Sequence, residues 1–182
     1  ELPPLGPQAQ GLYDPALDKD SCGVGFIANI KGKKSRDIVD KGIKLMCNLE
    51  HRGAEGADPK TGDGAGIMIQ IPDKFFRKVL PFPLPPEGEY GVGVLFLPQN
   101  REVREAIENI IEKVVIDEGE HFLGFRDIPI NPEYTGIVAS KTIPVFKNVF
   151  IGKNKKISSS DEFERKLFLI RRIIDRRVRS EY

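Results

Sequence analysis

The apolar run at residues 22–30 is the segment that most restricts the fold of this 182-residue chain. It reads Cys-Gly-Val-Gly-Phe-Ile-Ala-Asn-Ile, with apolar residues at odd and even positions alike. Successive side chains of a strand point to opposite faces, so such a run is typical of a strand covered on both faces. We therefore predict a layered domain that contains this strand.

Helices and further strands are expected to be mixed along the rest of the chain. Ser35 is a plausible N-cap for a helix of about four turns that ends at His51-Arg52-Gly53. Ser159 and Glu162 have capping-box spacing at the start of a last helix. Other predicted helices are residues 101–117 and a short one from Pro72-Asp73. Further predicted strands are residues 67–71, 91–97, 122–130 and 145–151. The pattern indicates an α+β domain.

Composition and charge exclude several classes of protein. The chain is 40% hydrophobic and 30% charged with a formal net charge of +1, so no overall field attracts nucleic acid or an anionic membrane. No apolar run approaches the roughly 20 residues that span a bilayer. Two cysteines, Cys22 and Cys47, are too few for a disulfide framework, although their spacing does not decide whether they pair. A reducing cytosol is the simplest location, so we expect a cytoplasmic protein.

Cys22 is the first candidate for chemistry. Gly23 and Gly25 leave its surroundings free of bulky side chains, and a deprotonated thiol is a strong nucleophile. The nearby sequence supplies no obvious base, and local features alone favour a buried thiol. If the chain were cleaved after Ser21, the new α-amino group, with a pKa of roughly 7.7–8.0, could act as the base. Residues 1–21 would then be a leader or propeptide.

Several motifs, in order and spacing, resemble the start of the glutamate synthase large chain. They are Leu12-Tyr13-Asp14-Pro15, Asp20-Ser21-Cys22-Gly23-Val24-Gly25-Phe26-Ile27-Ala28, Leu49-Glu50-His51-Arg52-Gly53-Ala54 and Thr61-Gly62-Asp63-Gly64-Ala65-Gly66. Residues 91–98, 124–129 and 164–172 extend the resemblance, which covers residues 12–182. The Cys-Gly and His-Arg-Gly motifs are typical of class II glutamine amidotransferases, and Thr-Gly-Asp-Gly narrows the resemblance to the glutamate synthase branch.

The resemblance implies a fold and a reaction. The fold would be part of the N-terminal-nucleophile hydrolase sandwich, a four-layer αββα arrangement of two antiparallel sheets. Residues 22–182 would be the N-terminal part of the amidotransferase domain. Cys22, freed of its propeptide, would attack the side-chain amide of glutamine and form a thioester. Glutamate and ammonia would result, the ammonia for transfer to 2-oxoglutarate. Arg52 would support the site through charge-assisted hydrogen bonds.

The glycine-rich loop also belongs to the expected site. Thr61-Gly62-Asp63-Gly64 resembles a phosphate loop, but the chain lacks the Gly-Lys-Ser/Thr ending and Asp63 would repel phosphate. In the family context, Gly53, Gly62, Asp63 and Gly64 are instead expected near the glutamine. His51 could be a base, although a bond to backbone at the helix end is favoured.

Two further features have simpler interpretations. Cys47 shares an apolar helix stripe with Ile43 and Met46, so core packing is predicted for it. A basic cluster near the end of the chain could contact an acidic partner. A solvated helix face, or a contact with the rest of a larger protein, is the favoured interpretation. The members of this cluster are Arg171, Arg172, Arg176, Arg177 and Arg179.

Two motifs of the family are absent from the sequence, those that hold the glutamine carboxylate and form the oxyanion hole. FMN and an iron–sulfur cluster would belong to the synthase part of the parent enzyme, and no cofactor or metal is expected here. Three alternatives follow: a piece of a glutaminase domain completed by the remainder of the polypeptide or another subunit, an inactive interaction or regulatory relative, or a hydrolase with a different oxyanion site. The first predicts exposed apolar surface, and thus self-association or dependence on a partner.

Overall fold

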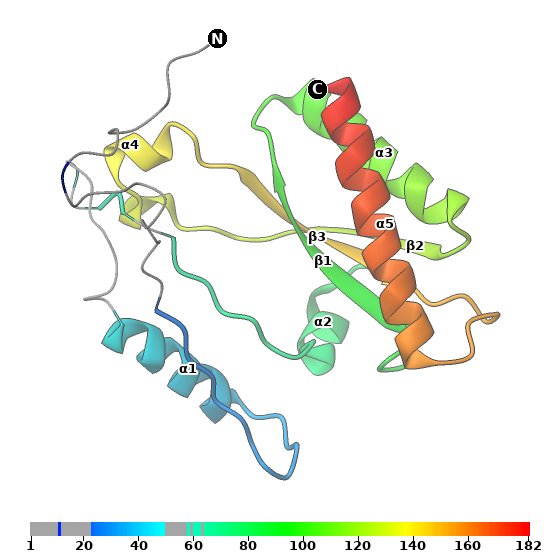
Figure 1. Cartoon of the computed structure of the whole chain (residues 1–182), viewed down its shortest axis with the longest axis horizontal. Helices are drawn as coiled ribbons and strands as arrows, with labels where there is room; N and C mark the ends of the chain where they lie inside the picture. Colours follow the sequence, from blue (N-terminus) through cyan, green and yellow to red (C-terminus); the bar gives the residue numbers. More distant parts are fainter. Residues whose placement is uncertain (1–10, 12–22, 50–57, 59, 63) are drawn as a thin grey trace. The chain divides into compact units, whose positions relative to one another are not determined.

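The computed structural model describes residue 11 and residues 23–49, 58, 60–62 and 64–182. It forms two compact units, Glu1–Met68 and Ile69–Tyr182, and each is considered by itself. The first contains α1 (Arg36–Asn48). The second contains the remaining elements shown in Figure 1: α2 (Asp73–Val79), β1 (Tyr90–Leu97), α3 (Arg101–Asp117), β2 (His121–Asp127), the 3-10 turn η3 (Pro132–Tyr134), α4 (Ile137–Ser140), β3 (Val145–Gly152) and α5 (Ser160–Glu181).

The second unit is built on a three-stranded antiparallel sheet with β3 at its centre. The strand order is β1-β3-β2. Phe150 of β3 pairs with Val92 of β1 on one side and with Gly124 of β2 on the other. The pairing of β2 is irregular between Phe122 and Gly124. Gly124 has φ 143° there, a backbone conformation that side chains disfavour, so a glycine is required.

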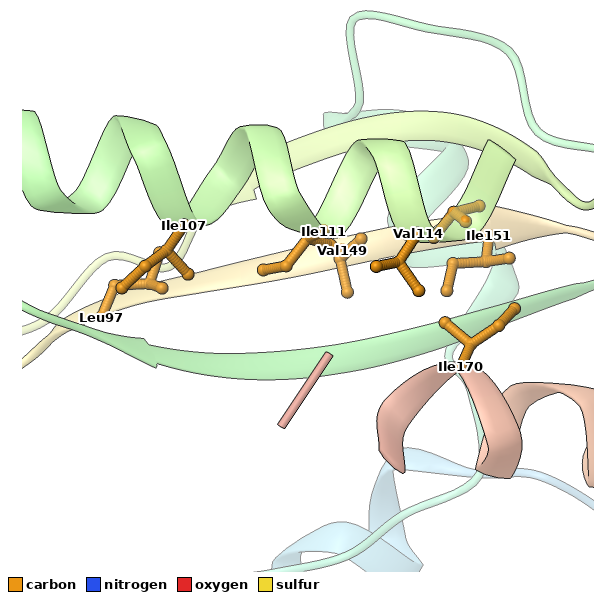
Figure 2. Packing of buried hydrophobic residues seen from close by; sticks show 8 residues of the cluster. Leu97, Ile107, Ile111, Val114, Val149, Ile151 and Ile170 are labelled. Atoms are coloured by element: carbon orange, nitrogen blue, oxygen red, sulfur yellow. The ribbon is translucent and has the colours of Figure 1, made fainter. Parts of the chain in front are cut away.

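One face of this sheet carries the main core. Val149 and Ile151 of β3 point to this face together with Leu97 of β1. Figure 2 shows Ile107, Ile111 and Val114 of α3 meeting them from one side, and Ile170 of α5 meeting them from another. Both long helices therefore lie on the same face of the sheet, and burial of their apolar stripes is the main force that holds them there.

The opposite face is covered at one end only. Phe150 is fully buried there, and its ring meets Phe76 of α2 edge-on with centroids 5.0 Å apart. Phe82 makes a similar contact at 5.6 Å. At the other end of the same face, Val94 and Phe96 of β1 are 56% and 68% exposed.

The helix caps confirm most of the predicted boundaries. The Ser35 side chain accepts a hydrogen bond from the amide of Ile38, and α3 spans the predicted residues 101–117. The Ser159 hydroxyl accepts from the amide of Glu162 at 3.1 Å. The return bond differs from the predicted capping box, because the Glu162 carboxylate accepts from the amide and hydroxyl of Ser158, both at 3.1 Å.

Two predicted strands are absent from the described structure. Residues 23–29 and 67–71 have no strand assignment, and Val24, Phe26 and Met68 are 89%, 90% and 96% exposed. A strand needs a neighbour to pair with its N–H and C=O groups, and none of the described strands pairs with either segment. The predictions were wrong for this structure because an apolar sequence does not supply its own pairing partner.

The fold class is confirmed as mixed helix and antiparallel sheet. The described residues form a single sheet with a helix layer on one face, so the second sheet of the expected sandwich is not among them. The proposed boundary between residues 21 and 22 lies outside the described residues.

Candidate functional site

The helix α1 is the element that connects the described parts of the candidate site. Ser35 caps its start, and Arg36–Asp40 and Lys41–Asp37 are exposed ion pairs on its surface with N–O distances of 2.8 and 2.7 Å. Such exposed pairs contribute little, so the helix depends on contacts along its apolar stripe. That stripe is half-buried, and its members are Ile38, Val39, Gly42, Leu45 and Met46.

The segment that follows Cys22 packs against α1. A Cβ atom placed on Gly25 would lie 2.6 Å from both terminal methyl carbons of Leu45. A side chain at residue 25 would require the end of the Leu45 side chain to shift, so glycine lets this segment lie close to Leu45 as it stands. Figure 1 shows this extended segment beside α1. Gly25 therefore has a packing role three residues beyond the candidate nucleophile.

The segment that follows the glycine-rich loop reaches the same helix one turn earlier. A Cβ atom on Gly42 of α1 would lie 2.9 Å from Cδ1 of Ile67. The absence of a side chain at residue 42 thus makes room for Ile67. Neither Leu45 nor Ile67 was predicted from the sequence as a supporting residue. The sequence did contain a signal for these close approaches, because Gly42 interrupts the apolar stripe of a helix and Gly25 interrupts an apolar run.

The start of the glycine-rich loop is held by a local turn around Asp58. The Thr61 hydroxyl donates to Oδ2 of Asp58 at 2.9 Å, and the Lys60 amide donates to Oδ1 at 3.2 Å. The Thr61 amide also donates to the carbonyl oxygen of Asp58 at 2.8 Å. Such aspartate turns fix the backbone just ahead of the loop.

Two of the predicted site residues lie in the described part of this loop. Gly62 and Gly64 are both exposed. A Cβ atom on Gly64 would have no neighbour within 4 Å, so packing in this structure does not require glycine there. The other predicted site residues, Cys22, Arg52, Gly53 and Asp63, lie outside the described residues, as does His51. Their roles stay predictions.

Cys47 does not occupy the core as predicted. It is an exposed free cysteine, and Ile43, on the same side of the helix, is 41% exposed. The apolar stripe of α1 is instead centred on Leu45 and Met46, which places Cys47 at its edge. Periodicity alone cannot fix the centre of a stripe to within one residue.

Among the described residues, the clearest pKa shift is that of Tyr90, and Tyr90 lies in a contact that supports the fold. The Tyr90 hydroxyl, on a residue only 3% exposed, donates to Oδ1 of Asp73 at 2.9 Å. Burial, and then this hydrogen bond, raise the pKa of Tyr90 to about 12. Asp73 also pairs with Arg77 at 2.9 Å. The three side chains join α2 to β1, so we assign them to stability.

Comparison with known proteins identifies the family. Residues 22–182 match the family described as "Glutamine amidotransferases class-II". The chain belongs to this family. The match begins at Cys22, the candidate nucleophile, and continues through α5.

The similar proteins within this family are glutamate synthases. The chain is 46% identical over 167 residues to the glutamate synthase [NADPH] large chain of Bacillus subtilis (strain 168), covering 91% of the chain and 11% of that protein. It is 41% identical over 173 residues to the corresponding large chain of Azospirillum brasilense, covering 93% and 11%. It is 38% identical over 187 residues to ferredoxin-dependent glutamate synthase 1, chloroplastic/mitochondrial, of Arabidopsis thaliana, covering 97% and 11%. The chain thus spans 11% of the length of these relatives.

The described residues carry neither a metal cluster nor a membrane-spanning helix. They contain no group of three or more His, Cys, Asp or Glu side chains arranged to hold a metal ion. In the same part of the chain, no helix combines the length and hydrophobicity needed to cross a bilayer.

Proposed function

We propose that this chain supplies the nucleophile-bearing part of the glutaminase site of a glutamate synthase. The observation that carries the proposal is the class II amidotransferase match, which begins at Cys22. The large-chain relatives favour the glutamate synthase branch and glutamine as the substrate. The remainder of a glutamate synthase polypeptide, or a complementing subunit, would be the partner that completes the site.

The proposed reaction uses the α-amino group of Cys22 as its base, after residues 1–21 have been removed. The amine takes the proton of the thiol, and the thiolate sulfur attacks Cδ of glutamine. As the C–N bond breaks, the protonated amine returns its proton to the leaving nitrogen, which departs as ammonia. Water then attacks the thioester, glutamate leaves, and the thiol is restored. The ammonia would pass to 2-oxoglutarate in the synthase part of the parent enzyme, which would also hold FMN and the iron–sulfur cluster.

Support for one common scaffold comes from α1. The segment after Cys22 contacts this helix at Leu45, and the segment after Gly62 and Gly64 contacts it at Gly42. The His51-Arg52-Gly53 motif follows its last residue, Asn48, closely in sequence. We propose that α1 thereby holds the three motifs in one region. Arg52, Gly53 and Asp63 would then assist glutamine binding, within a two-sheet αββα sandwich completed by the partner.

The experiment combines intact mass with active-site labelling. A glutamine-like diazo-ketone would be added to the chain, alone and with the remainder of a large chain such as that of Bacillus subtilis. The expected result is loss of residues 1–21 and one label on Cys22 in the completed protein. Cys47→Ser is the matched control, because it removes the exposed thiol that competes for the reagent.

Two outcomes would overturn this proposal. Retention of residues 1–21 in a protein that still hydrolyses glutamine would exclude the α-amine as the base. The second outcome is a completed protein in which Cys22 takes no label, both with Cys47 present and in the Cys47→Ser variant. That result would indicate an inactive, amidotransferase-like interaction or regulatory subunit.

A further inference from the structure

The helix α5 carries an unusual concentration of positive charge. Residues 165–180 contain seven basic side chains and a single acidic one, Asp175, although the whole chain has a net charge of only +1. The rest of the chain is therefore net acidic. Four more acidic residues of α5 lie before or after this segment, namely Asp161, Glu162, Glu164 and Glu181, so the positive charge is concentrated in residues 165–180 of the helix. Such a local concentration suggests a local binding surface rather than a general attraction to anions.

The charge lies on the side of α5 that faces away from the sheet. Phe163 and Ile170 are buried on the inner side. The outer stripe has helical spacing, is exposed throughout, and consists of Arg165, Phe168, Arg172, Arg176 and Arg179. Phe168, the only apolar member of this stripe, is 62% exposed. Arg172 and Arg179 share Asp175, whereas Arg165 and Arg176 form no ion pair within 4.0 Å among the described residues. Arginine and aromatic side chains together are typical of protein interfaces.

The neighbouring helix α3 presents the opposite charge in the same direction. Helix α3 contains five acidic and three basic side chains, and one of the basic ones, Arg101, pairs with Glu105 at 2.7 Å. The outer stripe of α3 is also exposed and consists of Glu102, Glu105, Asn109, Glu112 and Ile116. Ile116, at one end of this stripe, is 56% exposed although its neighbours Val114 and Val115 are fully buried. Each stripe therefore combines one kind of charge with one exposed apolar side chain.

The two helices lie next to each other in one layer. They share the core in Figure 2, and Lys166 of α5 pairs with Glu118 of α3 at 3.1 Å. Arg177 pairs with Asp117 at 3.5 Å. A two-fold axis outside this layer that runs along the helices would place α5 of one copy on α3 of the other, and the reverse. A surface of this kind is self-complementary, as a two-fold dimer interface requires.

We propose that a second copy of this chain docks on this helix layer, with the basic stripe of α5 against the acidic stripe of α3 in both directions. The surface is less suited to nucleic acid, because the adjacent carboxylates of α3 repel phosphate. It is also unsuited to membrane insertion, since the apolar stripe of α5 is already used against the sheet.

The test is the association of charge-reversed variants of the full chain, measured by sedimentation equilibrium. One variant carries Arg172→Glu and Arg176→Glu, and the other carries Glu105→Arg and Glu112→Arg. Each alone should raise the dissociation constant of the dimer about tenfold or more, because like charges then face each other. An equimolar mixture should recover a dimer, since both contacts again join opposite charges. Added salt should weaken the wild-type dimer.

The control has the same change in charge at another place. Lys155→Glu with Lys156→Glu alters two exposed lysines in the loop before α5 and should leave association unchanged. Circular dichroism checks that every variant is folded. A wild-type chain that stays monomeric at high concentration overturns the proposal, as does a mixture that fails to recover the dimer. Binding to nucleic acid or anionic vesicles that is lost only in the α5 variant would assign the surface to a polyanion instead.

Discussion

Tyr90 is the residue at which burial, hydrogen bonding and charge act together. Its ring belongs to the small core cluster of Phe76 and Phe150, and its hydroxyl donates to Asp73 at the start of α2. Asp73 also accepts from Nε of Arg77 at 2.9 Å. A buried hydroxyl that donates to a carboxylate contributes more than one that bonds to a neutral group. One side chain therefore fastens a short helix to the edge strand of the sheet.

The Tyr90 contact predicts a loss of stability at alkaline pH. The pKa of Tyr90 is about 12 in the folded chain and 10.0 for an ordinary tyrosine. The folded state thus holds this proton more tightly, so its stabilising effect is complete below pH 10 and is lost as the pH rises towards 12. We expect the difference in unfolding free energy between wild type and Tyr90→Phe to shrink over this interval, as measured by urea denaturation.

The difference in unfolding free energy between wild type and Tyr90→Phe at neutral pH is a second measurement of the Tyr90 contact. Tyr90→Phe should lower the unfolding free energy by about 1.5–3 kcal/mol, the value for a hydrogen bond to a charged group. Tyr134→Phe is the control, because Tyr134 is 78% exposed and should change little. A pH-independent difference between wild type and Tyr90→Phe would refute the titration of this hydroxyl.

At the candidate site, prediction from the sequence reached some residues and missed others. The resemblance pointed to Cys22 and the glycine-rich loop because short motifs retain chemical identity. It could not reveal that Gly25 contacts Leu45 or that Ile67 contacts Gly42, since those pairs of residues are 20 and 25 positions apart. Cys47 was misplaced for a related reason. Whether the edge of a helical stripe is buried depends on what packs against it, and the stripe alone does not specify that.

Among the elements, the helices were the most predictable. The boundaries of α3 and the N-caps of α1 and α5 rest on interactions within a few residues, such as Ser159 with Glu162. The strands of the sheet were also found, because β3 lies between two partners that satisfy its backbone. Residues 23–29 and 67–71 have the composition of strands, but none of the described strands pairs with them. Strand formation is decided by non-local pairing, which a local pattern cannot report.

The N-cap of α5 gives a prediction at this scale. The Ser159 hydroxyl accepts from the Glu162 amide, so Ser159→Ala leaves a first-turn amide without its cap. We expect the unfolding free energy of the second unit to fall by about 1 kcal/mol, measured by denaturant titration. The matched control is Ser180→Ala in the last turn, where the hydroxyl only donates back to the carbonyl of Arg177 and removal should be nearly neutral. Equal losses from both variants would contradict a specific capping role.

At the scale of the whole molecule, apolar burial is unevenly distributed between the two units. α3 buries Ile107, Ile111, Val114 and Val115, whereas α1 has no buried residue. The exposed apolar side chains of the first unit include Val24, Phe26, Ile30 and Met68. Helices of this length depend on tertiary packing more than on propensity. The candidate scaffold of the site is thus the part of the chain with the least packing of its own.

This imbalance predicts two very different opening free energies in one chain. Amides of α1 should exchange with solvent through local opening that costs little, whereas amides near Ile111 and Val114 should exchange only through unfolding of the second unit. Hydrogen exchange followed by mass spectrometry separates the two helices. If the remainder of a glutamate synthase large chain completes the domain, its addition should slow exchange in α1 at least tenfold and leave α3 nearly unchanged, because only α1 gains packing. Similar protection of both helices in the isolated chain would show that α1 already has the support that we assign to the partner.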